Sequence, residues 1–420
     1  MRERIGLNQD DLKRRNRGNV LHTILEKGPI CRRDIARHTS LTPATVSNLA
    51  AELLACGVVE EVGSAHSAAS RAGGPNPILL ALASGRPYLL ALRLGAAALE
   101  AAVVSLRGHI LARETLALPA DCTAARLLET VGELVALLCR RQSLEAQRDC
   151  LAVGFSSGLV VAPERGYIIW HQNRAFRGFA VRTELERLLG LPLFVGNTTQ
   201  AMALAEAWFG SGRTLENFLF VTAEEEIQAA VVLNRAVLVG TRSLSCMLGH
   251  GLAMAEGPLC TCGQRGCLEA VAGQAALVRQ AEALVATGQG RLAALARGSA
   301  LSLGLIREAS REGDEPCRRL LAARAAYLGQ AIAGALNVVD VQAVLLAGGA
   351  EAPEEREAVE AAYRAALRLP NNAPPLVYSP TAEDLPLLGA ATLVIRQVMS
   401  PRLAITPNIA GKLVASLHAV

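Results

Sequence analysis

Hydrophobic positions near the amino terminus recur at the spacing of α-helices. An apolar stripe over residues 20–25 predicts a first helix that ends at Gly28-Pro29, and a short second helix follows over residues 32–38. After a short turn, Thr42 is a typical N-cap residue and Pro43 suits the first position of a third helix. The positions that this helix is expected to bury are Val46, Leu49, Ala50 and Leu53.

The order helix, helix, short turn and helix is that of a helix-turn-helix module. Strand-forming residues 58–62 and 78–80, joined by a glycine-rich loop, would add a wing, so that residues 1–82 are predicted to form a winged helix. In such modules the start of the last helix enters the major groove of DNA. The exposed residues expected there are Thr42, Ala44, Thr45, Ser47 and Asn48.

The charge distribution favours a DNA-binding role for this module. Residues 13–37 hold eight basic residues against two acidic ones, whereas the net charge of the whole chain is only +4. A local basic excess attracts phosphate backbones. Arg32 and Arg33 are the expected phosphate contacts, and Arg71 in the glycine-rich loop is expected to reach a phosphate or the minor groove. A three-helix module used only for protein contacts is the competing interpretation.

Beyond the module, apolar runs of strand length alternate with helical stripes. The first block is predicted to contain strands at 88–94, 101–106, 110–111, 150–155 and 193–196 and helices at 124–140, 180–189 and 198–210. The second is predicted to contain strands at 218–222, 227–233, 236–239 and 343–346 and helices at 273–286, 294–303 and 317–337. Two such blocks predict two α/β lobes, residues 88–200 and 201–380, with a ligand cleft between them.

Composition sets the outer limits of this interpretation. A chain of 420 residues is too long to fold around a single hydrophobic core. Because 51% of its residues are hydrophobic but only 3% are aromatic, its cores must consist largely of Ala, Leu and Val. The charged first thirty residues lack the apolar region of a signal peptide. The apolar run 331–350 is interrupted by Asn337 and Asp340, which indicates a buried helix and strand instead of a membrane span. A cytoplasmic location is therefore expected.

A dense group of cysteines and one histidine lies within residues 246–269. Three thiolates and an imidazole are a ligand set that structural zinc prefers, and four protein ligands leave no open position for a catalytic water. The predicted ligands are His250, Cys260, Cys262 and Cys267. Gly263 and Gly266 would allow a tight turn around the metal. Buried or free thiols are the alternative, and Cys246 is a competing ligand.

The segment GHGLAMAEGPLCTCGQRGCLEA resembles the signature of the ROK family (repressors, open reading frames, kinases). The N-terminal NRGNVLHTILEKGPICRRDIARHTSLTPATVSNLAAELLACGVVEE is similar to the winged helix of its NagC/Mlc/XylR-type transcriptional repressors. Further similar segments are RAGGPNPILLAL, GSGRTLENFLFVT, LLAGG and LPLLGAATL. The resemblance implies a two-lobed, actin-like sugar-kinase fold, in which a C-terminal helix near 385–398 completes the first lobe. It also implies structural Zn²⁺, an operator DNA, a sugar or sugar-derivative effector, and homodimers or higher oligomers.

Carrying the family's sites over gives Asn197, His250 and Glu269 as sugar-contacting positions. The family's Asn-Asp pair is Asn197-Thr198 in this chain, and the Glu of its E-x-G-H motif is Met247. Threonine cannot act as a general base at neutral pH, so the resemblance implies a kinase-like domain without catalysis. The two replacements also favour a modified or less polar ligand over an unmodified hexose.

The family's nucleotide loops are altered as well. Its D-x-G-G-T motif is Arg93–Ala97 here, and its glycine-rich segment is Ala223–Ala229 with three consecutive glutamates that would repel phosphates. The sequence therefore predicts a DNA-binding regulator, acting as a repressor of carbohydrate-related genes. Two alternatives stay open: a sugar kinase with a regulatory DNA-binding module, and a regulator without a small-molecule ligand.

Overall fold

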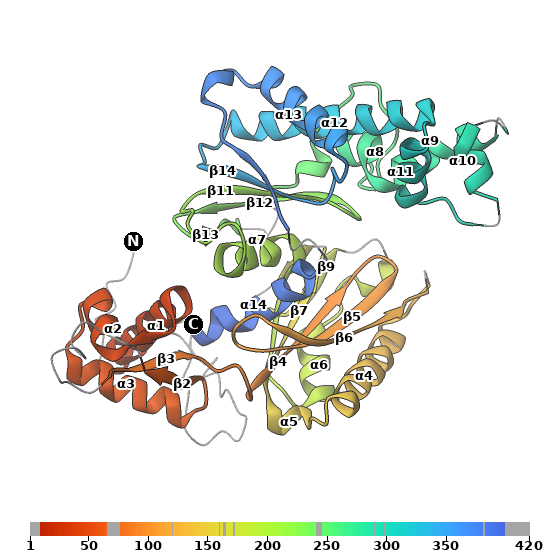
Figure 1. Ribbon diagram of the computed structural model, residues 1–420. Helices are drawn as coiled ribbons and strands as arrows, with labels where there is room; N and C mark the ends of the chain where they lie inside the picture. The colour runs from red at the N-terminus through yellow and green to blue at the C-terminus, as the bar shows by residue number, and fades with distance from the viewer. Residues whose placement is uncertain are drawn as a thin grey trace, which may run out of the picture. The chain divides into compact units, whose positions relative to one another are not determined.

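The structure is a computed structural model, shown in Figure 1. It describes residues 9–64, 76–119, 121–158, 160–162, 165–170, 173–240, 246–286, 288, 290–297, 299–380 and 383–399. The chain divides into two compact units, Met1–Phe209 with Asp384–Val420 (unit 1) and Gly210–Glu383 (unit 2). Arg71, a predicted DNA contact, lies outside the described residues.

Unit 1 begins with three helices and a small antiparallel sheet. The helices are α1 (Gln9–Lys27), α2 (Arg32–Thr39) and α3 (Pro43–Ala55), and the strands are β1 (Ile30–Cys31), β2 (Val59–Ser64) and β3 (Ile78–Leu82). The strand order is β1-β3-β2. The predicted apolar stripes are confirmed, because Val20, Leu21 and Ile24 of α1 and the four predicted positions of α3 are all buried. The order of the helices and of β2 and β3 is the one predicted from the sequence, and β1 was not predicted.

A five-stranded sheet follows in unit 1, in the order β10-β7-β4-β5-β6. Its strands are β4 (Tyr88–Leu94), β5 (Ala98–Val104), β6 (Ile110–Ala117), β7 (Cys150–Ser157) and β10 (Leu193–Asn197). The strands β10, β7 and β4 are parallel, and β4, β5 and β6 are antiparallel. The other elements are α4 (Ala124–Arg141), α5 (Ala146–Asp149), β8 (Val160–Ala162), β9 (Tyr167–Trp170), α6 (Val181–Leu189), α7 (Thr198–Phe209) and α14 (Leu385–Met399). Buried side chains of α4 and α6 form one core with this sheet.

Helix α14 comes from the end of the chain and packs against β4, β7, β10 and α7. At two glycines the sheet leaves no room for a side chain beneath this helix. A Cβ atom at Gly154 would lie 1.9 Å from the carbonyl oxygen of Ala390, and one at Gly196 would lie 2.7 Å from a methyl group of Leu393. The close approach therefore depends on glycine in the strands.

The three helices α1–α3 and the strands β1–β3, called the winged module below, are held to the five-stranded sheet by several contacts. The guanidinium of Arg107, in the turn after β5, donates to the carbonyl of Leu82 at 2.6 Å and pairs with Glu60 of β2 at 2.5 Å. Arg86, between β3 and β4, pairs with the buried Asp149 at 3.2 Å. Helix α1 also contacts α14. These contacts restrain the segment that links the module to the sheet.

Unit 2 is built on a second five-stranded sheet, in the order β13-β12-β11-β14-β15. Its strands are β11 (Phe218–Ala223), β12 (Ile227–Leu233), β13 (Ala236–Val237), β14 (Ala343–Ala347) and β15 (Leu376–Tyr378). Its helices are α8 (Leu268–Ala272), α9 (Gln274–Ala286), α10 (Gly290–Leu295), α11 (Leu303–Arg311), α12 (Glu315–Leu336) and α13 (Pro353–Ala366). A core of side chains from β11, β12, β14, α12 and α13 joins the layers.

One helix prediction in unit 2 was wrong. The predicted helix at 294–303 is replaced by the end of α10 and the start of α11, because Ser302 is an N-cap whose hydroxyl accepts from the backbone N–H of Leu305. The run 331–350 is confirmed as the end of a buried helix, α12, and a buried strand, β14. Among the described helices, none is long and apolar enough to cross a membrane.

The glycine contacts predict opposite effects of two alanine substitutions. Gly154→Ala should destabilise the protein by about 1–3 kcal/mol or more, because the new methyl group meets the backbone of α14. Gly132→Ala is the matched control in α4, where a Cβ atom meets nothing within 4 Å, and should stabilise by about 0.5–1 kcal/mol. Urea unfolding followed by circular dichroism measures both. Equal stability of the two variants would contradict the packing described for α14.

Candidate functional site

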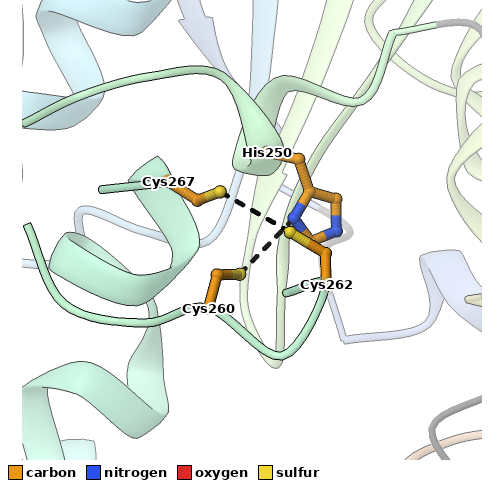
Figure 2. A group of neighbouring side chains, drawn as sticks. All are labelled: His250, Cys260, Cys262 and Cys267. Atoms are coloured by element: carbon orange, nitrogen blue, oxygen red, sulfur yellow. Dashed lines mark hydrogen bonds between the residues drawn. The ribbon is translucent and has the colours of Figure 1, made fainter. Parts of the chain in front are cut away.

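The four predicted metal ligands lie together in unit 2 (Figure 2). Their ligand atoms all lie within 4.8 Å of one another, and they come from His250, Cys260, Cys262 and Cys267. His250 ends a short 3₁₀ helix at Leu248–His250, and Cys267 precedes α8. Cys246 is not part of the group. Chain segments before and after a sharp turn therefore supply one common ligand set.

The turn between the cysteines is fixed by backbone hydrogen bonds and by two glycines. The N–H of Cys260 donates to the carbonyl of Gln264, and the N–H of Gly263 donates to the carbonyl of Cys260. Gly263 and Gly266 have φ of +93° and +72°, and a Cβ atom at Gly266 would lie 1.7 Å from the carbonyl oxygen of Met254. The predicted need for glycine at these two positions is confirmed.

Two of the distances between ligand atoms match the edges of a tetrahedral metal site. Cys262 Sγ lies 3.7 Å from Cys267 Sγ, and Cys260 Sγ lies 3.6 Å from Nδ1 of His250. Metal–sulfur bonds of about 2.3 Å and metal–nitrogen bonds of about 2.0–2.1 Å give tetrahedron edges of about 3.8 Å between sulfurs and about 3.6 Å between sulfur and nitrogen. Nδ1 is therefore the imidazole nitrogen that faces the group.

A bound cation would suit the charge states of these ligands. Burial, together with the neighbouring sulfurs of Cys262 and Cys260, raises the pKa of Cys267 to about 12. Crowded thiolates repel one another, and a bound divalent cation removes this penalty because it stabilises the deprotonated sulfurs. Burial lowers the pKa of His250, which favours the neutral imidazole that a metal requires.

Glu269, a predicted sugar contact, lies on α8 directly after the metal ligands. Its carboxylate accepts a hydrogen bond of 2.6 Å from the backbone N–H of Ile227 and lies against Gly249, the neighbour of His250. Burial raises the pKa of Glu269 to about 7. The structure thus places two of the three predicted sugar contacts, His250 and Glu269, next to each other in unit 2, whereas Asn197 belongs to unit 1.

A buried arginine joins the ends of three elements in unit 2. Arg324 of α12 is 2% exposed and donates three hydrogen bonds of 2.6–3.1 Å to backbone carbonyls. The acceptors are Ala223 at the end of β11, Ala272 at the end of α8, and Gly349 after β14. Burial lowers the pKa of Arg324 to about 10, so that the side chain stays charged at neutral pH.

Glu224 lies against Gly348, the first of the two glycines that follow β14. Gly348 and Gly349 have φ of +68° and +82°, and a Cβ atom at Gly348 would lie 2.2 Å from Oε1 of Glu224. The turn Gly348-Gly349 and the segment Ala223–Ala229, which contains Glu224, both correspond to glycine-rich motifs of the resembled family. A carboxylate therefore faces the turn, where a bound phosphate would be repelled.

In unit 1, the predicted sugar contact Asn197 lies at the junction of β10 and α7. Its side-chain oxygen accepts a hydrogen bond of 3.1 Å from the backbone N–H of Gln200, as an N-cap does. Thr198, which stands at the family's Asp position, is 6% exposed. Arg93, at the end of β4, pairs with Glu100 at 2.7 Å.

The start of α3 presents the predicted DNA-reading residues. Thr42 is the N-cap of α3, and its hydroxyl accepts from the N–H of Thr45 at 3.2 Å. The hydroxyls of Thr42 and Thr45 also share a hydrogen bond of 2.8 Å. Ala44, Ser47 and Asn48 are exposed. The two threonines therefore fix the start of the helix, and Thr42 is also exposed beside the three residues available to a partner.

The basic residues of the module differ in their surroundings. Arg17 is buried, and burial lowers its pKa. Arg32 pairs with Glu61 of β2 at 3.1 Å, and Lys13 pairs with Glu52 at 2.6 Å. The side chain of Arg33 is 63% exposed. The basic excess in the sequence is thus partly used within the module, and Arg33 extends furthest into solvent among the two predicted phosphate contacts.

Comparison with known proteins decides the family. The family model described as ROK family matches residues 89–397. The chain belongs to the ROK family. It is 25% identical over 344 residues to the DNA-binding transcriptional dual regulator NagC of Escherichia coli K12, a match that spans 81% of this chain and 82% of NagC. The predicted family resemblance is thereby confirmed.

Two solved structures share the fold of this ROK-family chain. A ROK family transcriptional regulator, a homolog of the E. coli MLC protein, matches with a TM-score of 0.78 and 26% identity over 93% of this chain and 98% of its own. The ROK hexokinase of Thermus thermophilus matches with a TM-score of 0.58 and 30% identity over 73% of this chain and 97% of its own. The predicted two-lobed ROK fold is confirmed.

Sequence reasoning missed several residues of these sites. Arg324 lies in the middle of a long helix, and no local pattern distinguishes it from a surface arginine. Ser156 and Ser157 end the buried strand β7, and their hydroxyls are buried. A signal for the serines did exist in the sequence, because polar residues directly after an apolar strand lie at the edge where α/β folds bind ligands.

The metal cluster predicts a loss of stability on chelation. A metal present at 100 times its Kd adds about 2.7 kcal/mol to the folded state. Its removal should therefore lower the Tm of the protein by roughly 5–11 °C, measured by differential scanning calorimetry with and without a chelator. Cys260→Ser is the control: it should contain no stoichiometric metal by mass spectrometry, and its Tm should not respond to the chelator. An unchanged Tm of the metal-free wild type would contradict a structural metal.

Proposed function

We propose that this ROK-family chain is a DNA-binding transcriptional regulator, acting as a repressor of carbohydrate-related genes, with a kinase-like effector domain that does not catalyse phosphoryl transfer. The observation that carries the proposal is the extent of the two structural matches. The ROK hexokinase covers 73% of the chain, and the ROK transcriptional regulator covers 93%. The larger match requires residues outside the family domain, where the three helices and the small sheet lie.

The exposed start of α3 supports recognition of a double-stranded operator. Its apolar side packs inward, and Ala44, Ser47 and Asn48 are exposed together within its first two turns. We assign Thr42 and Thr45 to fixing the N-terminus of this helix, whose partial positive charge suits a phosphate. Arg32, Arg33 and Arg71 would contact the DNA backbone. Operators with two half-sites would require the homodimer or higher oligomer that the family resemblance implies.

Three features of the chain support a regulator without catalysis. Thr198 replaces the carboxylate that would take a proton from a sugar hydroxyl. Glu224 lies against Gly348, where its charge disfavours phosphate. Arg324, the nearby buried cation, already donates to three backbone carbonyls. In unit 2, Arg324 is thus already hydrogen-bonded within the protein and Glu224 stands where a phosphate would have to lie.

Structural Zn²⁺ is the metal that we assign to His250, Cys260, Cys262 and Cys267. A site with three thiolates and one imidazole in tetrahedral arrangement is typical of zinc. When bound, zinc would supply cross-linking of the loop and no chemistry on a substrate. The chain itself then orients the neighbouring Glu269, because its backbone continues directly from Cys267 into α8. We place the protein in the cytoplasm, where its thiols stay reduced.

Two substitutions test the DNA-binding role. Arg33→Ala should weaken binding to all DNA sequences alike and reduce the salt dependence of log Kd by about one ion, because it removes a phosphate contact. Asn48→Ala should cost about 1–3 kcal/mol at its preferred base and relax the sequence preference there. Fluorescence anisotropy with a double-stranded DNA selected from a random library by the wild type measures both.

The matched control for these variants is Arg319→Ala, which removes an exposed arginine from α12 in unit 2. Its DNA affinity should equal that of the wild type. If the wild type selects no sequence, or if its affinity is insensitive to salt, the DNA-binding role is wrong and the module serves protein contacts instead.

The absence of catalysis has its own test. The wild type should give no ATP turnover above background with a panel of hexoses in a coupled assay. Thr198→Asp restores a carboxylate at position 198. It should nevertheless be inactive, because Glu224 still lies at the Gly348 turn. A ROK hexokinase in the same assay is the positive control. Hexose-dependent turnover by the wild type would favour the alternative of a sugar kinase with a regulatory module.

A further inference from the structure

We propose that the carboxyl ends of β4, β7 and β10 in unit 1 receive an anionic group of the effector, so that the effector is an acidic sugar, carrying a carboxylate or a phosphate. This inference rests on the proposed function, in which the kinase-like domain binds an effector. It names the chemical class of that ligand. All of the residues that support it belong to unit 1.

Three buried hydroxyls at these strand ends have no hydrogen-bond partner within the described part of the chain. They are Oγ of Ser156, Oγ of Ser157 and Oγ1 of Thr198. The two serines are 0% exposed, and Thr198 is 6% exposed. Most buried polar groups in native proteins are hydrogen-bonded, because an unpaired one loses its contact with water and gains nothing in return. Unpaired groups at the ends of neighbouring strands indicate a binding site for a ligand.

The strand register brings Ser157 and Thr198 together. Ser157 ends β7 and pairs with Asn197 of β10, and Thr198 follows directly as the first residue of α7. Neighbouring strands lie about 4.8 Å apart, so Ser157 and Thr198 are close neighbours. Ser156 and Ser157 point to opposite faces of β7, since side chains alternate along a strand. The anionic group is therefore expected to meet Ser157 and Thr198 where α7 begins, whereas Ser156 points to the opposite face of the sheet.

The charges around this edge favour an anion. The 12-residue helix α7 begins there, and a helix N-terminus carries partial positive charge. The carboxylate of Glu100 on the neighbouring strand is neutralised by its ion pair with Arg93 at 2.7 Å. Position 198 holds a hydroxyl that can donate, whereas an aspartate there would repel a negative ligand. The edge thus offers hydrogen-bond donors and a positive helix end.

The side chains at this edge suit an acidic sugar better than a neutral one in one respect. A neutral sugar hydroxyl donates most strongly to a carboxylate, and the carboxylate that the family has at position 198 is a hydroxyl in this chain. Serine and threonine hydroxyls can both donate and accept. Carboxylate and phosphate oxygens only accept, and each of the three hydroxyls can donate one hydrogen bond to them. The two anions share this chemistry, so the experiment includes both.

The experiment is isothermal titration calorimetry of the full-length, zinc-loaded protein. The ligands are a panel of uronic acids and hexose 6-phosphates, the parent neutral hexoses, and inorganic phosphate. At least one acidic sugar should bind ten or more times more tightly than its neutral parent, and the uronic acids and hexose phosphates distinguish carboxylate from phosphate. Thr198→Asp should reverse this preference by at least tenfold.

Thr198→Val separates binding from folding. It should weaken binding of the acidic sugar at least tenfold and leave the Tm unchanged or raised, because the lost hydroxyl has no partner within the described residues. Thr392→Val is the matched control: Thr392 is 0% exposed, and its hydroxyl donates to the carbonyl of Gly389 at 2.6 Å. That variant should have a lower Tm and unchanged affinity for the acidic sugar.

Equal or tighter binding of neutral hexoses would overturn the proposal, and so would unchanged acidic-sugar affinity in Thr198→Val. Absence of binding by the whole panel would overturn it too, while DNA binding by the same protein would leave the proposed function intact. Conversely, loss of the proposed DNA-binding function would show in the anisotropy experiment and not in the calorimetry. The two failures are therefore distinguishable.

Discussion

The contact of α14 with β7 is the constraint on which unit 1 depends. At Gly154 the backbone of a strand meets the backbone of a helix, with no side chain between them. The same helix contacts β4, β10, α7 and α1. It therefore sets the position of the strand ends that carry Ser157 and Asn197, and it also supports the first helix of the winged module. One layer of close packing thus supports both the proposed effector site and the winged module.

In unit 2, polar groups hold the loops at the strand ends in position. Its loops converge on Arg324, which connects β11, α8 and the turn at Gly349 through their carbonyls. Burying a charge is costly unless its donors are satisfied, and three short hydrogen bonds meet that condition. The metal cluster lies directly before α8, so a bound ion and Arg324 stabilise the two ends of one short helix. Glu269 lies between them, so its position is fixed as well.

Local patterns in the sequence predicted those parts that local interactions determine. The apolar stripes of α1 and α3, the N-cap at Thr42 and the spacing of the cysteines all act within a few residues of one another. The helix expected at 294–303 was wrong, because the N-cap at Ser302 outweighs a continuous apolar pattern. Contacts between distant residues gave no such signal: the Arg324 carbonyls, the Gly154–Ala390 approach and the grouping of Ser157 with Thr198 follow only from the assembled fold.

The position of α14 in the chain has a consequence for synthesis. Unit 2 is one continuous segment, whereas unit 1 lacks α14 until residue 399 has left the ribosome. At about 5–20 residues per second, the 190 residues between Phe209 and Met399 take roughly 10–40 s to translate. During that time the underside of the sheet, at Gly154 and Gly196, has no helix over it. The nascent chain therefore exposes an apolar surface until its last helix emerges, which makes this interval its most vulnerable to aggregation.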